Sequence, residues 1–299
     1  MERLQWLEER RRGIGGSDVA AILGLSPWKS PYRVYQEKRK EVEDWNGNEA
    51  TDWGKRMEPA IRQWYSDKTG LEVRLPDGII FNEKYPFMLA SIDGFTEGPR
   101  GVEIKTARSG KGWGEPGTNE IPDYYTLQVQ HYMAVTGLPV FDVPVSIAGG
   151  PPCLYEVPAD KELIEILIEA EAKFWQRVVD GNPPEPVNYA DAVQRFGKST
   201  STGSVMANDL IISSIESLRT TREKMDELKA TEETIKSGII SYLGDNGDCL
   251  ITPSGETLCT YKLAKGRKTF DAKTFEKDHP DLYSQYLKNG EPSRRFLLK

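Results

Sequence analysis

The segment Asp93-Gly94-Phe95, followed by Gly101-Val102-Glu103-Ile104-Lys105, determines the fold class and the chemistry of this 299-residue chain. An acid ends one apolar run, and a second run alternates apolar, acidic, apolar and basic residues. Side chains on a β-strand alternate between faces, so Glu103 and Lys105 are expected to share one face while Val102 and Ile104 point into the core. Two carboxylates, one ammonium group and the Ile104 carbonyl are therefore expected in one small volume.

These groups suit a divalent metal ion and a phosphate. Mg²⁺ prefers oxygen ligands and usually binds one or two carboxylates, several waters and a substrate phosphate. A lysine beside them can orient or help deprotonate an attacking water, and it offsets phosphate charge. The pattern predicts a metal-dependent phosphodiester hydrolase. Taken alone, it also fits an amphipathic hairpin with a solvated Glu-Lys face.

A helix is expected upstream, around Glu58. Apolar residues recur at helical spacing from Met57 to Tyr65, and Gly70 ends the segment. Pro59 directly follows Glu58, so this helix is expected to be kinked or to start there. The Glu58 carboxylate can reach into the same site and carry or position a second metal ion. An acid in the first turn of a helix is also favoured by the helix dipole alone.

The N-terminal segment Arg10-Arg11-Arg12-Gly13-Ile14-Gly15-Gly16-Ser17 combines cations, glycines and a hydroxyl group. Glycines let the backbone approach a ligand, and Ser17 is expected to cap a short helix whose free N–H groups favour a phosphate. The spacing is neither that of a dinucleotide-binding loop nor that of a Walker loop. The alternative is that this turn only packs the first helix on the sheet. Further along, a helix over residues 124–133 carries Gln128.

With these four blocks present in this order, the chain resembles the YqaJ-like viral recombinase family. These are phage-type nucleases related to lambda exonuclease, within the PD-(D/E)XK superfamily. The resemblance covers about residues 5–190. It implies an α/β fold with a restriction-endonuclease-like core, in which a mixed central sheet is flanked by helices. One departure is that Ile92 replaces the proline of the superfamily's Pro-Asp pair.

The resemblance also implies roles for individual residues. The catalytic set comprises Glu58, Asp93, Glu103 and Lys105. Asp93, Glu103, Glu58 and the Ile104 carbonyl would hold one or two Mg²⁺ ions, with Mn²⁺ as an alternative. Arg10, Ser17 and Gln128 would bind the DNA, at the 5′ phosphate or the backbone beside the scissile bond.

Amino-acid composition excludes several other classes of protein. Three scattered cysteines without a C-x-x-C pair argue against zinc fingers, a disulfide framework and an iron–sulfur cluster, and they indicate a reduced, cytoplasmic protein. No apolar run of membrane length is present, so no membrane partner is expected. His131 is expected on a helix surface and His279 in a turn.

The net charge of −7 is unusual for a DNA-binding protein, but its distribution is uneven. Residues 261–299 carry ten Lys or Arg against five Asp or Glu, which leaves −12 on the other 260 residues. A nuclease that encloses DNA in a channel needs positive charge only on the channel wall. The acidic total is therefore compatible with a DNA substrate.

Three segments are expected along the chain. Residues 1–190 form the nuclease core, residues 191–204 read as a linker rich in Ser, Thr and Gly, and residues 205–299 form an appendage. The appendage begins with a long amphipathic helix and continues with a small α+β module. This module is expected to bind DNA or a protein partner.

The resemblance implies a phage- or prophage-encoded exonuclease, acting in the cytoplasm of a bacterial host, that resects duplex DNA ends from 5′ to 3′. The product would be a 3′ single-stranded tail for a partner annealing protein. Similarity to lambda exonuclease suggests a homo-oligomer, a trimeric ring. Two alternatives stay open: an endonuclease that uses the same site, and a DNA-binding module that kept the fold without the chemistry.

Overall fold

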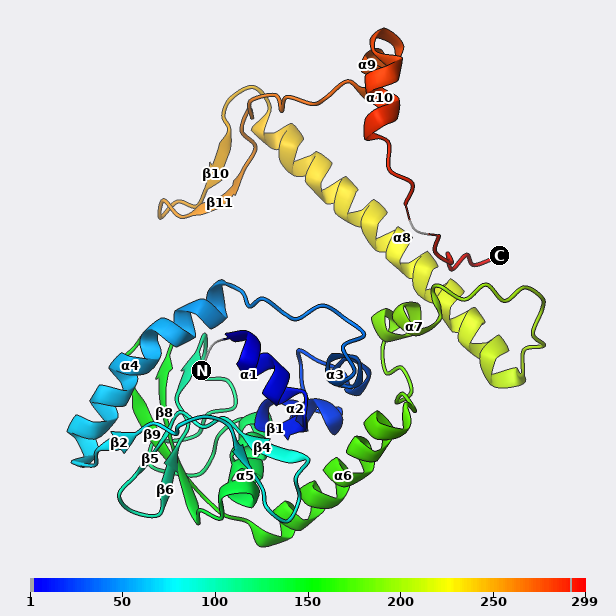
Figure 1. Ribbon diagram of the computed structural model, residues 1–299. Coiled ribbons are helices and arrows are strands. Elements are labelled where there is room, and N and C mark those ends of the chain that lie inside the picture. The colour runs from blue at the N-terminus through cyan, green and yellow to red at the C-terminus, as the bar shows by residue number, and fades with distance from the viewer. Residues whose placement is uncertain (1–2, 291) are drawn as a thin grey trace. The chain divides into compact units, whose positions relative to one another are not determined.

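In the computed structural model a mixed β-sheet lies between helices in the first of two units (Figure 1). The structure describes residues 3–290 and 292–299. The boundary between the units falls between Arg195 and Phe196. The elements up to this boundary are α1 (Arg3–Arg10), β1 (Ile14–Gly15), α2 (Gly16–Ile22), α3 (Pro31–Lys38), α4 (Glu49–Thr69), β2 (Val73–Arg74), β3 (Ile80–Phe81), β4 (Met88–Ala90), β5 (Gly94–Thr96), β6 (Arg100–Val102), β7 (Lys105–Ala107), α5 (Asp123–Thr136), β8 (Val140–Ile147), β9 (Cys153–Pro158), α6 (Lys161–Asp180) and α7 (Tyr189–Phe196).

The larger sheet has the strand order β2-β5-β6-β8-β7, and β9 pairs with β8 off this path. β6 and β7 both pair with β8 in parallel, whereas β5 pairs with β6 in antiparallel fashion. A second sheet has the order β1-β4-β3. The expected mixed central sheet flanked by helices is therefore confirmed.

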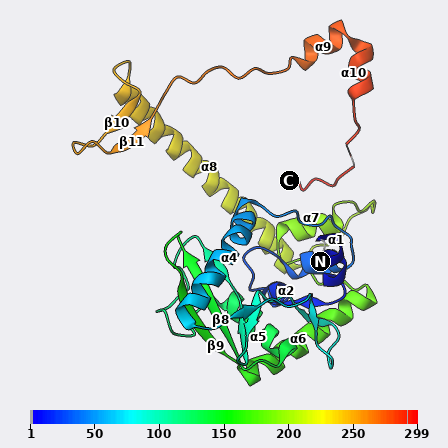
Figure 2. The same cartoon turned by 60° about the vertical axis from the view of Figure 1, so that its left-hand side comes forward.

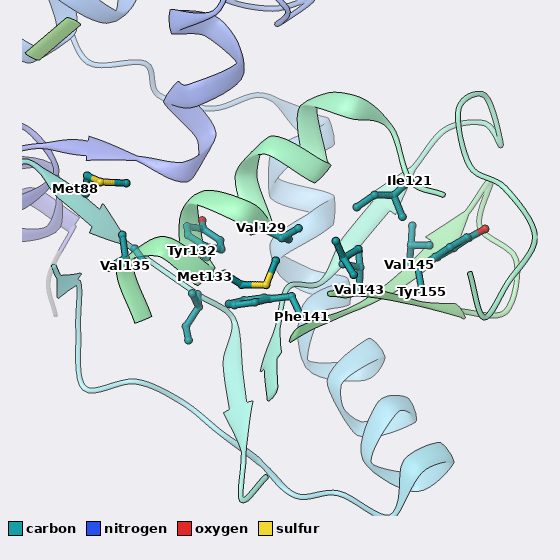
Figure 3. Close-up of a cluster of buried hydrophobic side chains, with 13 residues drawn as sticks. Met88, Ile121, Val129, Tyr132, Met133, Val135, Phe141, Val143, Val145 and Tyr155 are labelled. Carbon is teal, nitrogen blue, oxygen red and sulfur yellow. The ribbon is translucent and has the colours of Figure 1, made fainter. Parts of the chain in front are cut away.

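The two faces of β8 pack against different helices. Phe141, Val143 and Val145 are fully buried in a cluster with side chains of α5, as Figure 3 shows. Asp142 lies on the opposite face, where its carboxylate accepts a hydrogen bond from Tyr65 Oη of α4 at 2.5 Å. Because side chains alternate along a strand, one face of β8 packs against α5 and the other faces α4. Both helices are visible beside the strands in Figures 1 and 2.

The run from Gly101 to Lys105, expected to form one strand, is divided into β6 and β7 by a break at Glu103 and Ile104. At the break the Glu103 N–H keeps its hydrogen bond to β8, whereas the Ile104 N–H bonds to a side chain instead of a neighbouring strand. The N–H of Glu103 donates to the Asp142 carbonyl at 3.0 Å, and that of Ile104 donates to the Asp93 carboxylate at 2.7 Å. Val102 and Ile104 still pack in the core with α4, as the alternation predicts.

α4 does not start at Pro59, so that part of the expectation is wrong. The helix begins at Glu49, and Asn48 and Thr51 cap each other: each side chain accepts a hydrogen bond from the other's backbone N–H, at 3.0 and 2.8 Å. Such a cap satisfies two otherwise unpaired donors. Pro59 is accommodated inside the helix, where it removes one backbone hydrogen bond.

His131 is not on a helix surface, contrary to expectation. It is fully buried, with Nδ1 2.8 Å from the Glu171 carboxylate of α6 and Nε2 2.9 Å from the Leu89 carbonyl of β4. The reason is that α5 is covered on several sides. Its apolar residues pack against the sheet and also against α2 and α6, so that no helical stripe is left for solvent.

The expected linker from residue 191 is also partly wrong, because α7 covers Tyr189–Phe196. Asp191 is buried and accepts a hydrogen bond from Ser30 Oγ at 2.8 Å, across 161 residues of sequence. Ser30 also caps α3 by accepting from the Arg33 N–H. The first unit therefore extends to Arg195, beyond the boundary that composition indicated.

The second unit consists of α8 (Asp209–Leu243), the antiparallel hairpin β10 (Cys249–Ile251) and β11 (Thr257–Thr260), and the short helices α9 (Ala272–Asp278) and α10 (Pro280–Tyr286). Leu243 is the buried residue of α8. In the described part of the chain, no helix combines the length and the apolar character that crossing a membrane requires.

Candidate active site

Glu103 and Lys105 form a direct ion pair at the break between β6 and β7. Lys105 Nζ lies 2.6 Å from Glu103 Oε1, as expected for alternate residues on one face. Gln128 of α5 bridges the pair: its Nε2 donates to Glu103 Oε1 at 2.7 Å, and its Oε1 accepts from Lys105 Nζ at 3.1 Å. Tyr132, one turn later on α5, contributes its hydroxyl 2.9 Å from Gln128 Nε2.

Asp93 approaches the same place from the turn between β4 and β5. Its Oδ2 accepts the hydrogen bond from the Ile104 N–H, which ties the turn to the break in the neighbouring strand. The negative charge of Glu103 acts on Asp93, and so does the positive charge of Lys105. The structure thus brings together Asp93, Glu103, Lys105 and Gln128.

Glu58 acts on this group, at both Asp93 and Glu103, from α4 through its charge. Its side chain pairs with Arg62 one turn along the helix. Within residues 3–290 and 292–299, no three His, Cys, Asp or Glu side chains form a set poised to hold a metal ion. The metal ligands predicted from the sequence include only two central carboxylates, those of Asp93 and Glu103. The third ligand is the backbone carbonyl of Ile104, and Glu58 would serve a second ion.

Burial dominates the electrostatics of the two central carboxyl groups. It raises the pKa of Asp93 well above its ordinary value, and the neighbouring Glu103 charge adds to the effect. Burial likewise raises the pKa of Glu103, although the Lys105 ammonium opposes this. For Lys105, burial alone would lower the pKa, but the Glu103, Tyr125 and Asp93 charges outweigh it and raise the pKa.

The donor set fits a divalent cation on one further observation. Glu103 Oε2 is buried and makes no hydrogen bond, whereas its partner oxygen Oε1 accepts two. A buried unpaired carboxylate oxygen is costly. A cation held by Asp93 and Glu103 would satisfy this oxygen and relieve the repulsion between the two carboxylates.

The N-terminal block packs directly on α5. A Cβ atom on Gly16 would lie 2.6 Å from a ring carbon of Tyr132 and 3.0 Å from Cγ of Gln128, so only glycine allows this approach. Ser17 is not the helix cap, contrary to expectation. α2 begins at Gly16 with Gly15 as its cap, because the Asp18 carboxylate supplies the capping acceptor for the Gly15 N–H at 3.2 Å.

The structure distinguishes between the three adjacent arginines. Arg10 Nη2 donates to Ser17 Oγ at 3.0 Å, which joins the two residues that were expected to bind a phosphate. Arg11 instead pairs with Glu8 and Asp44, and the Arg12 guanidinium lies over the Phe81 ring at 5.4 Å. Of the three, Arg10 is therefore the one that faces the Ser17 turn.

Asp18 is the residue that sequence analysis missed. It is fully buried and pairs with Lys38 at 2.7 Å, Lys29 at 3.1 Å and Arg10 at 3.4 Å. Burial favours the neutral form, but these three cations hold the pKa of Asp18 well below its usual range. Burial lowers the pKa of Lys38 to about 8. No periodicity signals this cluster, since its members come from three helices and the turn between two of them.

One pocket lies away from these groups. It has a volume of about 500 Å³ and is lined by residues of α4 and the segment that follows, among them Arg62, Asp67 and Val73. None of Asp93, Glu103, Lys105 and Gln128 lines it. The chemistry of the side chains, rather than the size of a cavity, therefore identifies the candidate site.

Comparison with known proteins identifies the family of the chain. A YqaJ-like viral recombinase domain matches residues 5–139, a range that contains every candidate site residue from Arg10 to Gln128. The protein YqaJ of Bacillus subtilis (strain 168), itself described as uncharacterized, is 30% identical over 311 residues, covering 100% of this chain and 95% of that protein. The chain belongs to the YqaJ-like viral recombinase family.

The fold of this YqaJ-like chain is similar to that of an alkaline exonuclease, LHK-Exo from Laribacter hongkongensis. The two share 20% sequence identity with a TM-score of 0.50, over 60% of this chain and 94% of that one. The structure of LHK-Exo in complex with dAMP gives the same values. The similarity shows that the YqaJ-like core shares the fold of this exonuclease.

Proposed function

We propose that the chain is a metal-dependent deoxyribonuclease that resects duplex DNA from 5′ to 3′ and leaves 3′ single-stranded tails for an annealing partner. The observation that carries the proposal is the buried group of Asp93, Glu103, Lys105 and Gln128, with Glu103 Oε2 left without a partner. Family membership supports it, and so does the fold shared with an alkaline exonuclease.

Asp93, Glu103 and the Ile104 carbonyl would hold Mg²⁺, or Mn²⁺, and Glu58 would serve a second ion. When bound, the metal supplies Lewis-acid activation of water and charge stabilisation at the phosphate. Lys105 acts as a fixed cation, because its raised pKa keeps the ammonium charged at neutral pH. It orients the nucleophile and offsets the charge that develops on the phosphate oxygens. Gln128 holds both members of the Glu103–Lys105 pair in place.

Arg10 and Ser17 would bind a DNA phosphate on the N-terminal side of the site. The Arg10 guanidinium and the Ser17 hydroxyl are already hydrogen-bonded to each other, and Gly16 packs this turn against Gln128. A terminal 5′ phosphate carries more negative charge than an internal one and is the natural occupant in a resecting enzyme. Pairing with Asp18 fixes the position of the Arg10 side chain.

Cleavage assays with Mg²⁺ test the proposal. Linear duplex should be degraded and a covalently closed circular duplex should stay intact; cutting of the circle would instead identify an endonuclease. Linear duplex with 5′-phosphate ends should be degraded faster than the same duplex with 5′-hydroxyl ends. Absence of any magnesium-dependent nucleotide release would contradict the nuclease assignment and favour a silent binding module.

The Arg10→Ala substitution should bring the rate ratio between the two kinds of end close to one. Arg12→Ala is the matched control, because Arg12 packs over Phe81 rather than facing Ser17. It should leave the ratio unchanged. If both substitutions reduce the ratio equally, the effect comes from general positive charge and not from a specific phosphate site.

A further inference from the structure

Four aromatic side chains, Trp28, Tyr124, Tyr125 and Trp113, form a continuous row that leads to Lys105. The ring centroids of Trp28 and Tyr124 are 4.8 Å apart, and those of Tyr124 and Tyr125 are 4.5 Å apart. Lys105 Nζ lies 4.6 Å from the Tyr125 centroid, and Trp113 lies 5.7 Å from the same ring. Three steps of less than 5 Å thus connect a tryptophan to the proposed catalytic lysine.

The inner end of this row is anchored and its outer end is open. Trp113 and Tyr125 pack against the buried cluster between α5 and the sheet, and Tyr124 packs against the cluster formed with α2. Trp28 belongs to neither cluster and is 70% exposed. A single exposed apolar residue needs no special explanation. Here the continuity with Lys105, and not the exposure alone, points to a function.

A pocket of about 190 Å³ lies beside Trp28, with Ser26, Lys29 and Asn188 among its lining residues. The Lys29 ammonium that lines this pocket is already paired: its Nζ lies 3.1 Å from the Asp18 carboxylate and 2.8 Å from that of Glu37. The surface therefore offers aromatic area and neutral hydrogen-bonding groups rather than a free charge. This chemistry suits a nucleobase better than it suits a phosphate.

We infer that this aromatic row stacks on unpaired bases of the DNA strand that passes through the site. The inference rests on the proposed nuclease function and specifies how the strand is held. Bases stack on aromatic side chains largely without regard to sequence, which is what a resecting enzyme requires. Rings fixed by the core would receive each base without a large entropy loss. The row would also help to separate the strands, because stacking offsets part of the energy lost by unpaired bases.

Binding measurements test this inference independently of cleavage. The full chain is titrated, without divalent ions, with a fluorescent duplex that carries a short unpaired 5′ tail and with the same duplex whose tail nucleotides are abasic. The chain should bind the tail with bases more tightly. Trp28→Ala should remove about 5- to 100-fold of this preference, and Trp28→Phe should retain most of it. Trp45→Ala is the matched control, since Trp45 is 57% exposed and lies outside the row.

Equal binding of the two duplexes by the unmodified chain would overturn the inference. So would a preference that Trp28→Ala leaves unchanged, or an equal loss of both affinities. The two proposals fail separately: cleavage of linear duplex without a base preference refutes only the aromatic row. A base preference without magnesium-dependent cleavage refutes only the nuclease assignment. Trp28→Phe keeps the test valid if Trp28→Ala does not fold.

Discussion

The Glu103–Lys105 pair of the sheet and the Glu232–Lys236 pair of α8 have almost the same length, 2.6 and 2.5 Å, but lie in opposite environments. The side chains of the first pair are 5% and 14% exposed, and those of the second 61% and 63%. Burial raises the pKa of Glu103, whereas the hydrogen bond from Lys236 lowers that of Glu232. The same two residue types thus form a reactive pair in one region and a solvated pair in the other.

The difference shows that burial, rather than a short distance alone, shifts the pKa values of an ion pair and makes it chemically reactive. An exposed pair on a helix contributes a few tenths of a kcal/mol and is screened by water. In a buried pair the neighbouring groups are not screened by water. Gln128 donates a hydrogen bond to Glu103, and Asp93 and Glu58 both affect its pKa.

The largest effect is expected at the metal-binding carboxylates. Asp93→Ala and Glu103→Ala should each lower cleavage by more than about 10³-fold, because each removes a ligand of the proposed metal site. DNA binding should be largely retained, since loss of a negative charge does not weaken contacts to phosphates. The matched variant Glu232→Ala should cleave normally. Intact cleavage at saturating Mg²⁺ in either Asp93→Ala or Glu103→Ala would contradict the proposed metal site.

Lys105→Ala should reduce turnover by about 10²- to 10³-fold with little change in affinity, because its ammonium acts where charge develops in the transition state. Lys105→Arg should restore little of the rate, since a planar guanidinium is bulkier than the ammonium that Glu103 and Gln128 contact. Steady-state kinetics separate the two effects. Near-normal turnover with arginine would show that the residue is only a phosphate clamp. Lys236→Ala on α8 is the control.

Matched leucines test the packing of the two regions. Leu127 of α5 is 7% exposed, whereas Leu228 of α8 is 68% exposed. Leu127→Ala should lower the free energy of unfolding by about 2–5 kcal/mol, and Leu228→Ala should change it by less than about 0.5 kcal/mol. All seven tryptophans lie before residue 196, so their fluorescence follows the first unit. Far-UV circular dichroism follows the helices of both units, so a transition seen there but not in the fluorescence belongs to the second unit. A large effect at Leu228 would indicate that another surface covers this helix in solution.

A smaller effect concerns pH and the buried His131–Glu171 pair. Burial opposes the charged imidazole, but the Glu171 carboxylate outweighs it and raises the pKa of His131 above its ordinary 6.5. A raised folded-state pKa stabilises the fold fully below the unfolded pKa, and this stabilisation is lost as pH rises through the folded value.

Each unit of pKa difference corresponds to about 1.4 kcal/mol. The stability advantage of the unmodified chain over Glu171→Gln should therefore be largest below pH about 6.5 and should fall at higher pH. Urea titrations across the pH range measure it. A pH-independent difference would show that the imidazole stays neutral in the folded chain.

Most of the candidate site was predictable because it depends on local regularities. The period of a strand places Glu103 and Lys105 on one face, and the period of a helix places Gln128 and Tyr132 together. The order of these blocks along the chain then indicated the family, which the comparisons confirm. Glycine at position 16 could be read as a point of close approach, although not which residues approach it.

The amino-acid sequence by itself therefore determined the alternation of the central strands, the long helices and the choice of chemical groups. Only the tertiary structure decided which polar residues are buried together: Asp18 with Lys38, His131 with Glu171, and Ser30 with Asp191. It also decided that α4 starts at Glu49, with Asn48 as its cap, and that Arg10, not its neighbours, meets Ser17. The physical reason is that propensity and period act within a few residues, whereas burial depends on elements that are distant in sequence and is paid back only after they pack.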